Sequence, residues 1–373
     1  MDYNNEKLNF LHDEEKIELL KKANNALNLS NSNLNKIIFI YSHPKVGSTS
    51  LVTSIRIFAS HIYNVIHIHD ENMLKKLTNL KNLTINELII YNKFLGKEIF
   101  VIDVYRSPIE RKISIFFEKI DTLHFNYSNK DINNFNIEKI INRFNKIFPY
   151  IGNGDQFIDN YNINIPISFD YTNKYLNLIN NGINYIKLRL KDSDQWGIIL
   201  SKLLNVRIKV IKDYETKNKE INNTYLKFKE VYKIPINFLE DLDNCKYLNY
   251  FYSDSEKNEY FSEWSNRVDK YYQSFSLDDF KLYEYICNEN KHHEEIQSKH
   301  YLDEGCLCKA CFIKRSIIAN KIMRGEEMTE PVIHEKAKNE YIIKKIDLIK
   351  KKRIEKIKNL PLKENKRLNM KLI

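Results

Sequence analysis

A buried strand that ends in a short polar turn and a helix start is the feature that most constrains this chain. Residues 36–51, KIIFIYSHPKVGSTSL, begin with an apolar run typical of a strand buried on both faces of a parallel sheet. Pro44 and Gly47 end this run, and from Ser48 onward apolar residues recur at helical spacing. The first N–H groups of a helix have no partner within the helix, so with the helix dipole they favour an anion. The stretch predicts a strand, an anion-binding loop and a helix.

Side chains of this loop strengthen the prediction of an anion site. Lys45 carries a positive charge, and three hydroxyl residues at positions 48–50 can each donate a hydrogen bond to a phosphate oxygen. The loop is not a Walker A motif, because its lysine precedes Gly47 instead of following a glycine directly. That order disfavours an ATPase or a kinase-like enzyme. For the loop taken by itself, an ordinary strand-turn-helix connection is the alternative interpretation.

A second strand-to-helix corner follows later in the chain. Residues 98–105, EIFVIDVY, predict a strand, and Pro108 suits the first turn of a helix that alternates apolar and charged residues. Arg106 directly after the strand and Ser114 in the helix could face one pocket, offering a guanidinium and a hydroxyl to a phosphate. Arg111 could act in the same way. The alternatives are a surface ion pair for Arg106 and a neutral helix position for Ser114.

The two corners together resemble the sulfotransferases that use 3′-phosphoadenosine 5′-phosphosulfate (PAPS). Lys-x-Gly-Ser-Thr-Ser resembles their 5′-phosphosulfate loop, and Arg-Ser-Pro-x-Glu-Arg-x-x-Ser resembles their 3′-phosphate motif, in the same order along the chain. The resemblance implies that Arg106 and Ser114 hold the 3′-phosphate of PAPS. It implies that the 5′-phosphosulfate is held by Lys45, Val46, Gly47, Ser48, Thr49 and Ser50.

Within that superfamily the chain is most similar to the capsular polysaccharide synthesis family of sulfotransferase-like proteins. The segments that carry this similarity are Val-Gly-Ser-Thr-Ser, IHIHD and YLNYFYSDSEKNEYFSEW, while NVIHIHD and SPIERKIS resemble glycosaminoglycan 2-O-sulfotransferases. The resemblance implies transfer of a sulfuryl group from PAPS to a hydroxyl of a carbohydrate acceptor, a glycan or polysaccharide, with no metal required. Lys45 would then stabilise charge on the leaving bridge oxygen.

Two histidines are the candidates for the catalytic base. His67 and His69 are two residues apart at the end of a predicted second strand, so they share one face. Histidine titrates near neutral pH and can accept the proton of an acceptor hydroxyl. The 2-O-sulfotransferases place a histidine pair just before the third strand, but no histidine lies between His69 and Tyr105 here. We therefore expect His69, or failing it His67, to be the base. A half-buried strand face with hydrogen-bonded imidazoles is the alternative interpretation, and a metal site is a weaker one.

The rest of the pattern predicts an α/β fold: a three-layer, P-loop-like, mostly parallel sheet flanked by helices. We expect an N-terminal helical segment at 1–34, the sulfotransferase-like domain at 35–267 and a helical, basic extension at 268–373. A loop-rich stretch at 151–171 could close over an acceptor. The aromatic residues around 250–264 are predicted to pack in the core and cap, and a stacking platform for bases is the less favoured alternative. Further elements are expected at 13–26, 84–95, 133–148, 183–190, 195–204, 223–232 and 238–246.

Charge and cysteine content concern mainly the extension. Residues 336–373 hold 14 Lys/Arg and four Asp/Glu, which accounts for the whole net charge of +10. This tail could contact a polyanion such as a glycan, nucleic acid or a membrane surface, or form a solvated or partner-docking helix. The extension also holds a cluster of one histidine and three cysteines: His300, Cys306, Cys308 and Cys311. These residues could bind zinc or be reduced thiols, and the sequence favours reduced thiols.

The sequence also bears on localisation and on whether the protein is an enzyme. No stretch approaches the ~20 apolar residues of a membrane helix, no signal peptide is recognisable, and five cysteines fit a reducing compartment. We therefore expect a cytoplasmic protein without a transmembrane segment. The alternative to an enzyme is a catalytically inactive, sulfotransferase-like module that binds a nucleotide or a polyanion. The acceptor and the oligomeric state do not follow from the sequence.

Overall fold

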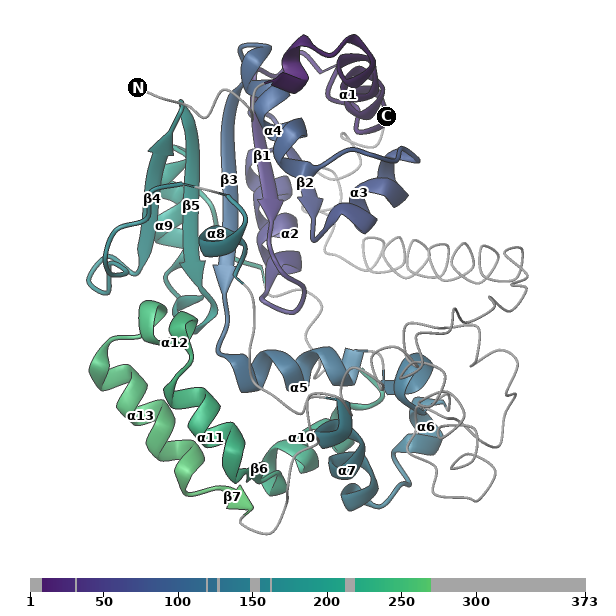
Figure 1. The fold of residues 1–373 in the computed structure, drawn as a ribbon, viewed down its shortest axis with the longest axis vertical. Coiled ribbons are helices and arrows are strands. Elements are labelled where there is room, and N and C mark those ends of the chain that lie inside the picture. Colours follow the sequence, from purple (N-terminus) through teal and green to yellow (C-terminus); the bar gives the residue numbers. More distant parts are fainter. Residues whose placement is uncertain are drawn as a thin grey trace, which may run out of the picture. The chain divides into compact units, whose positions relative to one another are not determined.

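The protein is an α/β structure built on one five-stranded sheet. The computed structural model describes residues 9–30, 32–118, 120–125, 128–147, 155–161, 163–211 and 219–269, all within one compact unit of the chain. The strand order is β2-β1-β3-β5-β4; the first four are parallel, and β4 pairs antiparallel with β5 (Figure 1). The strands are β1 (Lys36–Tyr41), β2 (Tyr63–Ile68), β3 (Glu98–Tyr105), β4 (Tyr175–Asn180) and β5 (Ile183–Arg189). A separate short pair joins β6 (Ile234–Pro235) and β7 (Val268–Asp269).

Helices occupy most of the connections between these strands. The α-helices are α1 (Glu14–Ala26), α2 (Ser48–Ala59), α3 (Glu71–Thr78), α4 (Ile85–Phe94), α5 (Pro108–Glu118), α6 (Asn129–Ile132), α7 (Ile137–Ile147), α8 (Gln156–Asp159), α9 (Trp196–Leu203), α10 (Asn222–Val231), α11 (Ile236–Asp243), α12 (Lys246–Phe251) and α13 (Asp254–Ser265). Short 3₁₀ turns form η2 (Asn9–His12) and η4 (Leu190–Asp192), and η3 (Ile120–Phe125) is π-helical.

Successive side chains of a strand point to opposite faces of the sheet, so the core has two layers, one on each face. Ile38 and Ile40 of β1 pack with apolar residues of α2 and α9. Ile37 and Phe39 point to the other face, where α1 and α4 contribute buried residues. Because both faces are covered, β1 is a continuous apolar run and not an alternating one. The predicted three-layer α/β fold with a mostly parallel sheet is confirmed.

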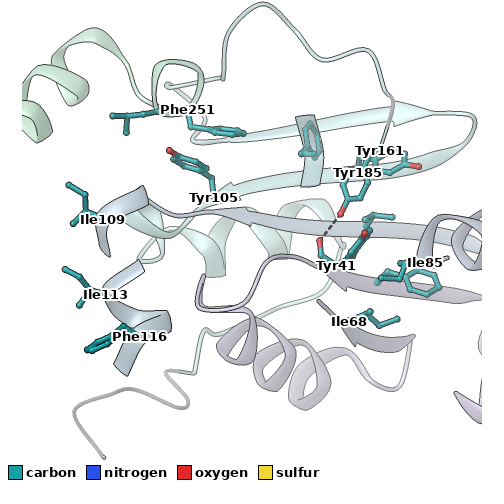
Figure 2. Packing of buried hydrophobic residues seen from close by; sticks show 14 of the residues in the cluster. Tyr41, Ile68, Ile85, Tyr105, Ile109, Ile113, Phe116, Tyr161, Tyr185 and Phe251 are labelled. Carbon is teal, nitrogen blue, oxygen red and sulfur yellow. Dashed lines mark hydrogen bonds between the residues drawn. The ribbon is translucent and has the colours of Figure 1, made fainter. Parts of the chain in front are cut away.

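Aromatic side chains fix the ends of the central strands. The Tyr161 hydroxyl donates a 2.7 Å hydrogen bond to the carbonyl oxygen of Tyr41, the last residue of β1 (Figure 2). At the end of β3 the Tyr105 ring stacks on Phe251, with ring centroids 4.4 Å apart. Figure 2 also shows the apolar side of α5 continuing from this point. Segments distant in sequence thus hold the carboxyl ends of β1 and β3 in place.

These carboxyl ends lie at the topological switch of the sheet. After β1 the chain forms β2 on one side of it, then crosses over to form β3 on its other side. In open α/β sheets, ligands bind outside the carboxyl ends of the strands at such a switch. The two predicted corners, β1 to α2 and β3 to α5, are both located here (Figure 1), and the helices begin at the predicted residues Ser48 and Pro108.

Several elements differ from the sequence predictions, among them the helix expected at 238–246, which ends at Asp243 before a new helix begins at Lys246. The helix expected at 133–148 was wrong in its first turn: α6 ends at Ile132, and α7 begins only at Ile137. Asparagines intervene, and the side chain of Asn136 accepts a hydrogen bond from the backbone of Glu138, which favours a turn. The antiparallel edge strand β4 was not predicted. Its asparagines and exposed positions lack the apolar run that marks the central strands.

The aromatic segment confirms one further prediction, whereas other predictions concern residues that the structure does not describe. Phe251, Tyr260 and Trp264 are buried, which confirms core packing for the aromatic segment. Residues 151–154, the Cys/His cluster and the basic tail lie outside the described residues, so those predictions stay predictions. In the part of the chain that the structure describes, no helix has the length and apolar character required to cross a membrane.

Candidate functional site

The first corner has a strained and closely packed loop. Gly47 precedes α2 with φ +87°, a left-handed conformation that disfavours other residues. A Cβ at this position would lie 2.9 Å from Leu190 Cδ1 and 3.0 Å from Trp196 Cη2. Lys45 also has positive φ, at +66°, although it is not a glycine. Strained residues often occur at ligand sites, and here the strain lies at the predicted anion-binding lysine.

The remaining loop residues differ in what they can offer to a ligand. Val46 is 1% exposed and packs in the core beneath α2, so only its backbone could contact a ligand. Ser48 is also buried, whereas Thr49 and Ser50 are half-buried. The N-cap residue of α2 is Gly47, which has no side chain to cap the helix. Backbone N–H groups of this first turn are therefore the anion donors that the corner presents.

A hydrogen bond joins the second corner to the first. Arg106, directly after β3, donates from Nη1 to the carbonyl oxygen of Lys45 over 2.7 Å. Tyr225 of α10 and Glu110 interact electrostatically with the Arg106 guanidinium. The guanidinium is thus held against the backbone of the loop from a position 61 residues later. The structure brings the predicted 5′-phosphosulfate loop and the predicted 3′-phosphate arginine into direct contact.

A carboxylate links two lysines at the same place. Glu118, at the end of α5, accepts at Oε2 from Lys45 Nζ over 2.9 Å and contacts Lys219 Nζ through the same oxygen. Burial raises the pKa of Glu118, but Lys45 and Lys219 outweigh it and lower the value to about 2. The pKa of Lys45 is lowered by burial and by the nearby cations Lys219 and Arg106. With Arg106 nearby, the cluster sets three basic side chains against one carboxylate.

The two candidate histidines lie together at the end of β2. Their ring centroids are 4.5 Å apart, and His69 Nδ1 lies 2.6 Å from the carbonyl oxygen of Ser42. Because a carbonyl can only accept, Nδ1 carries the proton, so Nε2 is the acceptor in the neutral ring. Burial lowers the pKa of His69, and Lys45 and Arg111 lower it further. Burial and the neighbouring His69 lower the pKa of His67 to about 3. Both shifts favour the neutral imidazole.

Several buried polar atoms at this edge find no hydrogen-bond partner among the described residues. Native proteins satisfy most such atoms, so a group of them indicates a place for water or a ligand. Three belong to residues at the carboxyl ends of β1, β2 and β3, and the fourth lies in the first turn of α5: Ser42 Oγ, His67 Nε2, Tyr105 Oη and Arg111 Nε. The Arg111 guanidinium is electrostatically coupled to Arg106, Tyr105 and Asp103. The same edge therefore combines cations with unsatisfied polar atoms.

Beneath this edge lies a buried ion network that the sequence did not indicate. Lys187 of β5 is 0% exposed and bonds Asp103 of β3 at 2.7 Å and Asp155 at 2.5 Å. Burial, opposed by Lys187, raises the pKa of Asp103 to about 6. On α5, Lys112 is buried as well, and burial together with Arg111 lowers its pKa to about 7. The charged side of α5 therefore faces the site and the core, and not bulk solvent.

The structure joins most of the predicted residues by contacts, but it shows no hydrogen bond between Ser114 and Arg106 among the described residues. The Lys45 loop, Arg106 and His69 share one edge, whereas Ser114 is buried on α5. Glu118 and Lys219 were missed. Both are single charged residues 73 and 101 positions from their partners, Lys45 and Glu118. No spacing rule would have paired them.

Comparisons with known proteins identify no relative. No protein-family model, no curated protein and no solved structure matches the chain. A search for metal sites finds no group of three or more His, Cys, Asp or Glu side chains that could hold an ion within the residues described. The site must therefore be interpreted from its own geometry.

Proposed function

We propose that this protein is a PAPS-dependent sulfotransferase that transfers a sulfuryl group to a hydroxyl of a carbohydrate. The observation that supports it best is the 2.7 Å hydrogen bond from Arg106 to the Lys45 carbonyl. It places two motifs that resemble the two halves of a PAPS site at one switch point of an α/β sheet. Either motif alone would be ordinary loop chemistry.

The residues present fit a donor with two anionic groups. The N-terminus of α2 with Lys45 would hold the 5′-phosphosulfate, and Arg106 would hold the 3′-phosphate. Gly47 allows the loop backbone to pack closely against Leu190 and Trp196, since a side chain at this position would collide with both. The unsatisfied Nε of Arg111 offers a further donor to an anion or to the acceptor. Ser114, which the resemblance assigns to the 3′-phosphate, is buried on the same helix as Arg111.

The chemistry requires positioning, charge neutralisation and one proton transfer. PAPS, when bound, supplies the sulfuryl group and leaves as the 3′,5′-bisphosphate. Lys45 would stabilise the charge that develops on the bridge oxygen, as cations do in phosphoryl transfer. His69 would accept the proton of the acceptor hydroxyl at Nε2, because its Nδ1 proton is fixed on Ser42. A lowered pKa keeps this imidazole unprotonated at neutral pH and available as a base.

Calorimetry with adenosine 3′,5′-bisphosphate and ATP tests the donor site. We expect the bisphosphate to bind more tightly than ATP and Arg106→Ala to weaken it by about 10- to 100-fold, since a charge-assisted bond contributes ~1.5–3 kcal/mol. Arg56→Ala is the matched control, because Arg56 also donates to one backbone carbonyl, that of Val65, but lies at the other end of α2. Preference for ATP, or no binding, would contradict the proposal.

A transfer assay separates an enzyme from an inactive binding module. Labelled PAPS is incubated with a panel of glycans, and sulfate incorporation is measured for the wild type, Lys45→Ala and His69→Ala. We expect incorporation that falls by ~10²–10⁴-fold in His69→Ala, the range for loss of a general base. Bisphosphate binding without any incorporation would support the inactive module instead. An unchanged rate in His69→Ala would transfer the role of base to His67.

A further inference from the structure

In the ion cluster beside the loop, a carboxylate of the protein itself lies where two lysines could bind an anion. One oxygen, Glu118 Oε2, is bound by the ammonium groups of Lys45 and Lys219, which come from different parts of the chain. The backbone of Lys45 is at the same time fixed by Arg106. Resting on the proposed function, we propose that Glu118 is a positioning residue whose carboxylate takes the place of a donor oxygen, and that Lys219 is a second cation of the donor site.

The exposure of the three side chains supports an exchangeable contact. The side chains of Lys45, Glu118 and Lys219 are 15%, 26% and 23% exposed, so the cluster is neither sealed in the core nor fully solvated. Elsewhere the protein buries a lysine between carboxylates completely, as at Lys187, which is 0% exposed. Complete burial of this kind is what we expect of an ion pair with a purely structural role. The partly exposed cluster instead leaves the carboxylate and both ammonium-bearing side chains in contact with solvent.

The charges determine what can replace the carboxylate. Two lysines share a single negative charge in the cluster, and Arg106 adds another cation nearby. A sulfate or phosphate group offers several anionic oxygens and up to two charges, so it can bind both ammonium groups at least as well as Glu118 does. Binding then requires Glu118 to leave. An incoming anion must compete with it, which lowers the apparent affinity of the ligand-free site.

Neutralising Glu118 tests this exchange. We expect Glu118→Gln to bind adenosine 3′,5′-bisphosphate and inorganic sulfate on the order of tenfold more tightly, because an adjacent like charge and a competing ligand are both removed. Glu98→Gln is the matched control: Glu98 pairs with Lys36 at 2.7 Å, but at the opposite ends of β1 and β3. Lys219→Met should weaken bisphosphate binding by about tenfold, because it removes one of the two ammonium groups that would bind the anion.

Thermal unfolding in a sulfate series provides a readout that a purely structural ion pair would not change. Glu118→Gln should melt below the wild type without sulfate and should gain more from added sulfate than the wild type or Glu98→Gln. Equal gains, or weaker bisphosphate binding by Glu118→Gln, would overturn the inference. If one of these results is found but the wild type still binds the bisphosphate and Arg106→Ala weakens that binding, the proposed function stands. Only the role of Glu118 and Lys219 then falls. If no variant binds the bisphosphate but sulfate selectively rescues Glu118→Gln, the anion site stands and the PAPS assignment falls.

Discussion

Replacing Gly47 with alanine should destabilise the protein through two separate effects. The backbone stays at φ +87°, where a residue with a Cβ costs about 1–2 kcal/mol. The new methyl group would also lie 2.9 Å from Leu190 Cδ1 and 3.0 Å from Trp196 Cη2, and overpacking of this kind costs about 1–3 kcal/mol. Urea unfolding should therefore show a loss of about 2–5 kcal/mol. Bisphosphate binding should weaken too, because the loop must shift away from Trp196.

Gly96 offers a control that separates the two effects. It has φ +79°, but a Cβ there would meet no atom within 4 Å. Gly96→Ala should therefore show the backbone cost alone, and the two variants should differ by about 1–3 kcal/mol. If both variants lose the same stability, the contact with Leu190 and Trp196 does not constrain the loop, and the argument that Gly47 is required for close packing fails.

Two further predictions concern buried titratable groups. The pKa of His67 is lowered by burial to about 3, so its contribution to stability is present above pH ~6.5 and is lost as the pH falls toward 3. Unfolding free energies should fall by up to about 1.4 kcal/mol per pH unit in this window, and His67→Phe should flatten the profile; identical profiles would refute a buried neutral imidazole. Lys187→Met should cost about 3–5 kcal/mol, because Asp103 and Asp155 lose the cation between them. Adding Asp103→Asn should recover part of that loss in urea unfolding, and a purely additive double variant would argue against the network.

Local patterns were sufficient to predict the two corners. The apolar runs of β1 and β3 are continuous because both faces of the sheet are covered, and helix-start residues follow each strand. The resemblance implied that the corner after β1 and the corner after β3 hold one PAPS molecule, and parallel strands that end at one edge of a sheet allow the two corners to meet. The bond from Arg106 to Lys45 agrees with that expectation.

Long-range pairing explains what the sequence could not predict. Glu118 and Lys219 are brought to the loop by the packing of α5 and of the segment before α10, and neither has a distinctive local pattern. Lys187 interrupts an apolar strand and was not recognised as buried, since its partners Asp103 and Asp155 are 84 and 32 residues away. The helical spacing of α5 placed Lys112 on a polar side, yet that side faces the interior. Side-chain charge alone does not show whether a helix position is exposed.

A crystal structure with adenosine 3′,5′-bisphosphate would locate the nucleotide on the protein. The proposed site predicts the 5′-phosphate on the N-terminus of α2 with Lys45, and the 3′-phosphate on Arg106. It also predicts Lys219 on the 5′-phosphate side, with Glu118 displaced from both lysines. A nucleotide bound at another edge of the sheet, or with the two phosphates exchanged between the corners, would contradict the assignment of this site to PAPS.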